Sequence, residues 1–167
     1  MIAFSRIAAA LVFAALIAAG CSRPDFSQSN KTPTSTEPAP DLPGWARGFE
    51  GHKIASVGAQ KLGACNGFVD GVLARYAGAR PGAQIAGWGW DTVAKRPFSK
   101  VVLTGDGSLV VGAGASGIER PDVPKVIPSI TSTKTGWTAI VHESSGALQA
   151  WGVSGAGVCL LGRYDLK

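Results

Sequence analysis

The chain has 167 residues, of which 46% are hydrophobic and only 16% are charged, and its net charge is +5. This length predicts one folded domain with additional segments, and the 23 glycines favour turns and short strands over long helices. The 16 basic residues are scattered, and the densest group (Lys95, Arg96 and Lys100) is typical of a solvated surface. We therefore expect no nucleic-acid partner.

The first 20 residues predict an export signal. A single charge at Arg6 precedes the apolar stretch 7–19, which is shorter than the about 20 residues that a transmembrane helix needs. The stretch ends in Ala18-Ala19-Gly20-Cys21, which resembles the lipobox of bacterial lipoproteins. The resemblance implies that Cys21 becomes a lipid-bearing N-terminus, and Ser22 favours the periplasmic side of the outer membrane. Ordinary signal cleavage, which would leave Cys21 free, is the alternative.

The next segment predicts a flexible tether. Residues 22–44, SRPDFSQSNKTPTSTEPAPDLPG, are rich in Pro, Ser and Thr and contain few apolar side chains. Such a segment cannot bury enough apolar surface to offset the entropy that it would lose on ordering. We therefore expect the lipidated Cys21 and a disordered tether to occupy residues 21–44, and the folded domain to occupy residues 45–167.

From Trp45 onward the pattern predicts an all-β domain, a small antiparallel β-sandwich or barrel. Short β-branched runs alternate there with Gly, Asp and Ser. The expected strands are 84–91, 100–104, 109–112, 136–143, 147–153 and 157–161. Gly105-Asp106-Gly107-Ser108 is typical of a hairpin turn between the second and third strands, and Ser144-Ser145-Gly146 connects the fourth and fifth.

Residues 62–76 fit two interpretations. Apolar residues recur there at helical spacing, but Gly63, Gly67 and Gly71 interrupt the pattern, and each would weaken a helix by about 1 kcal/mol. We expect a strand around Gly67–Ala74, with a short helix as the alternative.

The run LVVGAGASG at 109–117 matches the GxGxxG pattern of dinucleotide-binding loops. In such loops the glycines open a helix whose N-terminus holds the pyrophosphate. Here Pro121 and Pro124 follow closely, and proline disrupts helix interiors. We therefore expect no cofactor, and we interpret the glycines as allowing a tight strand exit or a bulge.

The chain has three cysteines, Cys21, Cys65 and Cys159. If Cys21 is lipidated, Cys65 and Cys159 remain and can form a disulfide in the oxidising periplasm, with two buried free thiols as the alternative. His52 and His142 are isolated, and no Cys or His lies at metal-ligand spacing, so no metal is expected.

No catalytic constellation is recognisable, so we expect no enzyme. Gly114-Ala115-Ser116-Gly117 is one residue short of a nucleophile elbow, and His142 fits a partly exposed strand position. The four aspartates near turns, Asp70, Asp91, Asp106 and Asp122, are explained by bonds from side chain to backbone. Arg120 and Asp122 flank a rigid proline and predict a loop locked by a salt bridge, with ligand recognition as the alternative.

The five tryptophans offer a further functional interpretation. Trp88 and Trp90 are two residues apart and share one face of a strand. Burial in the core is the expected state, and Gly87 and Gly89 on the opposite face would allow close packing. The alternative is that Trp88, Trp90 and Trp151 stack on the sugars of an envelope glycan.

Five short motifs follow one another along the folded part. They are Cys65-x-Gly67-x-Val69-Asp70, Gly87-Trp88-Gly89-Trp90-Asp91, Arg120-Pro121-Asp122-Val123, Gly136-Trp137 and Cys159-x-Leu161. In this order they resemble an uncharacterised β-rich domain of bacterial envelope proteins, which is often appended to membrane-bound sugar-processing proteins. The resemblance implies an extracytoplasmic β-sandwich-like module without assigned catalytic residues and with a disulfide between Cys65 and Cys159.

The function expected from these features is that of a non-enzymatic envelope lipoprotein. Its domain would be a tethered module for binding or a structural adaptor, with the membrane as the partner of its lipid and an envelope protein or glycan as a further partner. A glycan-binding module is the alternative, and an enzyme of unknown type is the third possibility. The candidate ligand-binding residues are Trp88, Trp90, Trp151, Arg120 and Asp122.

Overall fold

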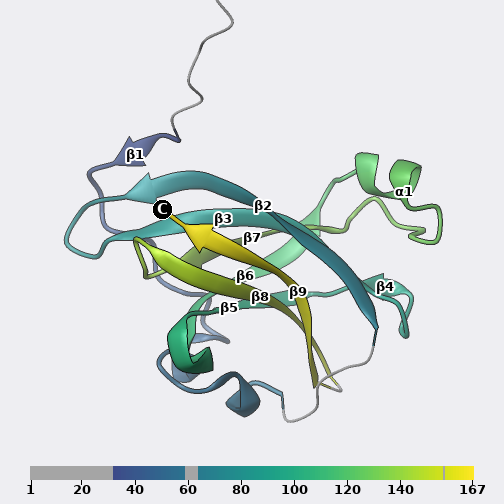
Figure 1. Cartoon of the computed structure of the whole chain (residues 1–167), viewed down its shortest axis with the longest axis horizontal. Helices are drawn as coiled ribbons and strands as arrows, with labels where there is room; N and C mark the ends of the chain where they lie inside the picture. Colours follow the sequence, from purple (N-terminus) through teal and green to yellow (C-terminus); the bar gives the residue numbers. More distant parts are fainter. Residues whose placement is uncertain (1–31, 59–63, 156) are drawn as a thin grey trace, which may run out of the picture. The chain divides into compact units, whose positions relative to one another are not determined.

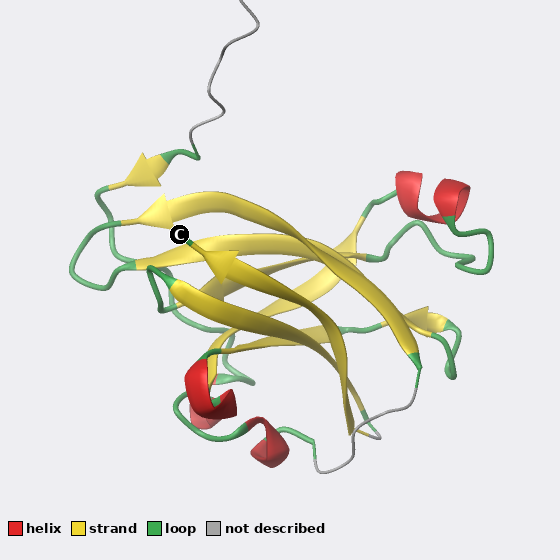
Figure 2. Cartoon of the chain, in the orientation of Figure 1, coloured by secondary structure: helices red, strands yellow, loops and turns green. Residues whose placement is uncertain are grey.

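The computed structural model describes residues 32–58, 64–155 and 157–167. The expected signal peptide, the lipidation site Cys21 and residues 22–31 of the expected tether lie outside this range. The described residues form one mixed sheet of nine strands, which confirms the all-β prediction (Figures 1 and 2). The strands are β1 Thr34–Ser35, β2 Cys65–Tyr76, β3 Gly82–Asp91, β4 Arg96–Pro97, β5 Lys100–Thr104, β6 Val110–Ile118, β7 Gly136–Val141, β8 Gly146–Ser154 and β9 Gly157–Leu166.

The strand order is β1-β2-β3-β7-β6-β5-β8-β9, with β4 paired to β3. All pairs are antiparallel except β1 with β2. Helical structure among the described residues is confined to three 3₁₀ turns and one short α-helix. These are η1 Arg47–Phe49, η2 Ile54–Ser56, η3 Asp106–Ser108 and α1 Asp122–Val126.

The ambiguous segment 62–76 contributes β2, so the strand interpretation is confirmed for its described part. Two irregularities in the register, between Val69 and Gly71 and between Val72 and Ala74, explain the misleading spacing. Val69 is buried and Val72 packs against the same core. They are three residues apart rather than two because the first β-bulge inserts an extra residue. A bulged strand can therefore imitate helical periodicity.

The expectation of a tether up to residue 44 is wrong for its described part. β1 pairs with the end of β2, Ala39 is fully buried and Leu42 is 2% exposed. The backbone N–H of Ala39 donates to the carbonyl of Arg80 at 2.7 Å, and the Arg80 side chain donates back to the Ala39 carbonyl. The polar composition of residues 22–44 does not predict these few contacts. The folded domain therefore begins well before Trp45.

The main core lies on the inner face of the sheet. It consists of Val69, Ala83, Ile85, Phe98, Val101, Leu103, Trp137, Ala139, Val141, Leu148, Ala150, Cys159, Leu161 and Leu166. Three further clusters lie outside this core. Residues 45–57 cover Val102, Val110 and Trp151, Leu42 and Ala46 pack against Ala113, and the loop that contains α1 covers Trp90.

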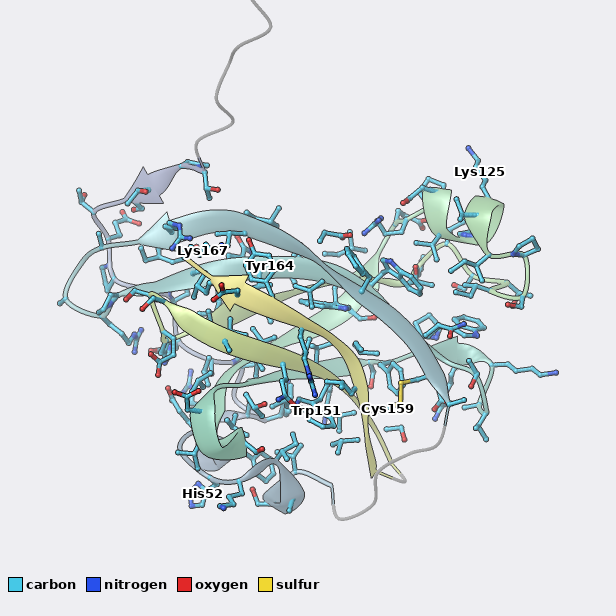
Figure 3. The ribbon with its side chains drawn as sticks, viewed as in Figure 1. His52, Lys125, Trp151, Cys159, Tyr164 and Lys167 are labelled. Atoms are coloured by element: carbon cyan, nitrogen blue, oxygen red, sulfur yellow. A yellow bond between two sulfur atoms is a disulfide. The ribbon has the colours of Figure 1, made fainter. Side chains whose placement is uncertain are left out.

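Side chains join β2 to β9, the long strands near opposite ends of the strand order. Cys65 and Cys159 form the disulfide that the sequence suggested, with their Cα atoms 6.4 Å apart (Figure 3). Leu161 lies against Gly67, where an added Cβ would come within 2.7 Å of the leucine Cβ. At the other end of β2, Arg75 donates to the carbonyl of Lys167. The last strand is thereby held against the first long one.

The glycines of the GxGxxG pattern lie inside β6. An added Cβ at Gly112 or Gly114 would collide with the backbone of β7, and Gly117 has a φ of 114° at a register shift. The expected bulge is therefore present at Gly117, whereas Gly112 and Gly114 allow the close approach of β7. The short helix α1 begins only at Asp122, and Pro124 is tolerated in its first turn, where its missing N–H is not needed.

Candidate functional site

Two aromatic side chains lie next to each other on the outer face of β2 and β3. Phe68 and Trp88 are directly opposite each other in the register of the two strands. Both face outward, because their neighbours Val69 and Gly87 face the inner core, where Gly87 abuts the Trp137 ring. Phe68 is 58% exposed, and Trp88 is half-buried against the cluster beneath α1. Cross-strand partners of this kind have Cβ atoms about 5 Å apart, so the two rings form one surface.

An ionic cluster of three residues lies beside this aromatic pair. The Arg120 guanidinium donates to Asp70 on β2 at 2.5 Å and to Asp122 at 2.9 Å from Nε and 2.8 Å from Nη2. The two bonds to Asp122 form a fork that fixes the plane of the guanidinium. The expected salt bridge between Arg120 and Asp122 is therefore present, and Asp70 is an additional partner.

Arg120 and Asp122 stabilise each other's charged form. The hydrogen bond from Arg120 is the largest cause that lowers the pKa of Asp122 below its ordinary value. The hydrogen bond to Asp122 is in turn the largest cause that raises the pKa of Arg120, against an opposing effect of burial. Two carboxylates and one guanidinium give the cluster a net charge of −1.

The pairing of the strands brings the aromatic pair and the ionic cluster together. Trp88 is opposite Gly136 in the pairing of β3 with β7, and Gly136 is opposite Ile118 in the pairing of β7 with β6. A Cβ at Gly136 would lie 2.8 Å from Cγ of Arg120, so the glycine leaves room for the arginine stem next to Trp88. We call the set Phe68, Asp70, Trp88, Arg120 and Asp122 the aromatic–ionic face.

Trp90 and Trp151 are buried, which is the state expected for the tryptophans and leaves neither ring available for the alternative role as a sugar platform. Trp90 shares its face with Trp88 but is only 3% exposed, because Val123 and Ile130 of the α1 loop cover it. Trp151 is 6% exposed on β8, and its Nε1 donates to the hydroxyl of Thr104 at 3.0 Å. Of the three candidate rings, only Trp88 reaches the surface in part.

Asp91 and His142 have structural partners. Asp91 accepts hydrogen bonds from the backbone N–H groups of Val93 and Ala94 at 3.0 and 2.9 Å, as expected for a turn-capping residue. His142 is half-buried, with Nδ1 2.5 Å from a Glu50 carboxylate oxygen and Nε2 2.9 Å from the Pro40 carbonyl. This histidine ties the segment before β2 to the end of β7, and neither ring nitrogen faces an open site.

Two adjoining cavities lie near the turn between β8 and β9. One, of about 320 Å³, is lined by Asp91, Arg96 and Phe98. The other, of about 330 Å³, is lined by Trp45, Phe49 and Lys100, and the Lys100 ammonium lies 5.0 Å from the centre of the Trp45 ring. The Lys100 ammonium therefore covers the face of the Trp45 ring on which a ligand would otherwise stack. For this reason we place the candidate site at the aromatic–ionic face.

Phe68 and Asp70 were not predicted as site residues from the sequence. Phe68 alternates with the buried Val69, and this alternation was the available signal that Phe68 faces outward. Asp70 belongs to the first of the five ordered motifs, but its partner Arg120 is 50 residues away, and no local pattern predicts their contact.

The motifs that carried the resemblance meet in the structure. Gly67 and Gly89 leave room for Leu161, and Cys65 is bonded to Cys159. Gly87 lies against Trp137, as Gly136 does against Arg120. The ordered motifs therefore supply the contacts that hold β2 against β9 and build the aromatic–ionic face.

Within residues 32–58, 64–155 and 157–167, no group of three or more His, Cys, Asp and Glu residues could hold a metal ion. None of the helices in these ranges is long and apolar enough to cross a membrane. No family model, no curated protein and no solved structure matches the chain.

Proposed function

We propose that this chain is a non-enzymatic, lipid-anchored binding module of the bacterial envelope. The observation that carries the proposal is the exposed aromatic pair Phe68 and Trp88 beside the ionic cluster around Arg120. Leaving a phenylalanine ring 58% exposed contributes little to folding. An exposed aromatic surface rimmed by oriented polar groups is typical of a binding site.

Two features support export and anchoring. The Cys65–Cys159 disulfide fits an oxidising compartment, such as the periplasm. The sequence before Cys21 resembles the signal of lipoproteins, and we propose lipidation of that residue at the periplasmic side of the outer membrane. Because residues 32–44 belong to the folded domain, the proposed tether shortens to residues 22–31.

The side chains of the face favour binding over catalysis. Asp70 and Asp122 both accept hydrogen bonds from Arg120, and the pKa of Asp122 is lowered, so this carboxyl does not hold a transferable proton near neutral pH. The His142 ring is engaged at both nitrogens and lies on β7's end rather than at the face.

Anchoring is tested by expressing the full chain with its own signal in a Gram-negative host that is fed radiolabelled palmitate. We expect label in the wild-type protein and in Ser22→Ala, and no label in Cys21→Ser. Label that persists in Cys21→Ser, or is absent from the wild type, would contradict lipidation at this residue.

Binding is tested in the same cells with a photoreactive amino acid in place of Phe68. We expect an adduct at position 68 and none when the photoreactive residue replaces Leu109, which is 39% exposed and lies between η3 and β6. If both positions give the same pattern, the aromatic–ionic face is not a binding surface.

A further inference from the structure

We propose that the aromatic–ionic face binds an uncharged polymer of hexopyranose sugars. This inference rests on the proposed binding function and names the chemical class of its ligand. One sugar ring would stack on Phe68 and Trp88, and hydroxyl groups of the same or the next sugar would donate hydrogen bonds to Asp70 and Asp122.

The aromatic pair supplies the stacking surface. A pyranose ring has a face of C–H groups that packs against the flat, electron-rich face of an aromatic ring. Phe68 is 58% exposed, whereas Trp88 is half-buried and held from below by the cluster that includes Ile127. Because Trp88 is already immobilised by its packing, little side-chain entropy is lost when a ligand binds to it.

The ionic cluster supplies oriented hydrogen-bond acceptors. An ionised carboxylate has about four acceptor sites, of which Arg120 occupies only some on each aspartate. The side chains of Asp70 and Asp122 are 37% and 59% exposed. Hydrogen bonds from hydroxyl groups to charged acceptors are stronger than neutral ones, and the fork from Arg120 keeps the Asp122 carboxylate in a fixed direction.

The charge of the face favours an uncharged ligand. The cluster has a net charge of −1, and its only cation is already bonded to both carboxylates. Glu119 is exposed next to Arg120, and Lys125 on α1 projects away from the sheet (Figure 3). A uronic acid or a phosphorylated sugar would therefore meet repulsion from the excess negative charge of the ionic cluster.

A protein partner is the competing occupant, and the same groups argue against it. A buried protein interface would remove the acceptor lone pairs of Asp70 and Asp122 from water, which is costly unless donors replace the water. Sugar hydroxyls supply such donors at high density.

The experiment uses the mature, lipidated full chain in detergent micelles and measures its affinity for defined oligosaccharides by calorimetry. The uncharged probes are hexamers of glucose and of N-acetylglucosamine, and the anionic probe is a hexamer of galacturonate. We expect saturable binding of at least one uncharged probe and at least about tenfold weaker binding of the galacturonate hexamer.

Three variants locate the site. We expect Phe68→Ala and Asp122→Asn each to weaken binding by about tenfold, and Leu109→Ala to leave it unchanged. The exposed ring of Phe68 can be removed without opening the core. Thermal unfolding of each variant checks that the fold is retained.

The inference is overturned if no uncharged probe binds, if the galacturonate hexamer binds more tightly, or if Phe68→Ala binds like the wild type. A protein adduct at position 68 in the photo-crosslinking experiment, together with no sugar binding, would overturn the glycan ligand and leave the proposed binding function standing. The absence of any adduct and of any sugar binding would overturn both.

Discussion

Cys65 on β2 and Cys159 on β9 are bonded to each other across 94 residues of sequence, with their Cα atoms 6.4 Å apart. The two strands lie near opposite ends of the strand order, so this bond joins parts of the sheet that no strand pairing connects directly. Two residues after Cys159, Leu161 packs against Gly67, which directly precedes Phe68. The disulfide therefore supports the strand that carries half of the aromatic pair.

Removing the disulfide should lower the stability of the domain substantially. On the chain-entropy model a loop of 94 residues gives about 4–5 kcal/mol of stabilisation, because the bond restricts the unfolded chain. We expect the double variant Cys65→Ser/Cys159→Ser to lose most of this free energy in urea unfolding. The matched control is Cys21→Ser, which should unfold like the wild type. A double variant within about 1 kcal/mol of the wild type would show that strand packing alone holds β9 in place.

Adding a methyl group at Gly136 should disturb the ionic cluster. Its Cβ would lie 2.8 Å from Cγ of Arg120 and 2.9 Å from the Ile118 carbonyl oxygen, so both must move. We expect Gly136→Ala to cost about 1–3 kcal/mol as an overpacked site. Gly44→Ala is the control, because nothing lies within 4 Å of its added Cβ. Equal unfolding temperatures for the two variants would contradict this arrangement.

Acid should weaken the link between α1 and the sheet. Arg120 lowers the pKa of Asp122 in the folded state, so its contribution to stability is present above the unfolded pKa of about 3.9 and is lost as the pH falls through the lower folded value. The hydrogen bond from Arg80 lowers the pKa of Asp41 in the same sense. We expect stability to fall below about pH 4, and to fall less steeply in Asp122→Asn. Unfolding curves between pH 7 and pH 2 measure both slopes, and identical slopes would exclude the contribution of Asp122.

Two buried tryptophans should respond differently to the same substitution. Trp151 Nε1 donates to Thr104, which is fully buried. Trp137 Nε1 is buried and has no hydrogen-bond partner within the described ranges. We expect Trp151→Phe to cost about 1 kcal/mol more than Trp137→Phe, because only the former leaves a buried hydroxyl without its donor. Chemical unfolding of both variants decides this, and a larger loss for Trp137→Phe would contradict it.

The sequence predicted the strands best where turns delimit them. The expected strand 100–104 coincides with β5, since Lys100 follows a short turn and Gly105 ends the run. The segment 62–76 was harder, because bulges after Val69 and Val72 break the two-residue alternation that identifies a strand.

The candidate site could be predicted only in part. Trp88, Arg120 and Asp122 were identified from local patterns, whereas the contact of Arg120 with Asp70 depends on a loop from β6 crossing to β2. The burial of Trp90 was also unpredictable, because residues that follow it by more than 30 positions, Val123 and Ile130, cover its ring. Local sequence cannot reveal which outer face of a sheet a distant loop will cover.

The most direct test of the binding role is a map of backbone amide shifts by nuclear magnetic resonance while the mature chain is titrated with the glucose and N-acetylglucosamine hexamers. We expect the shifts to concentrate at Phe68, Asp70, Trp88, Arg120 and Asp122. Shifts that concentrate instead at Trp45, Phe49 and Lys100 would place the site in the cavity beside β5 and contradict the assignment to the aromatic–ionic face.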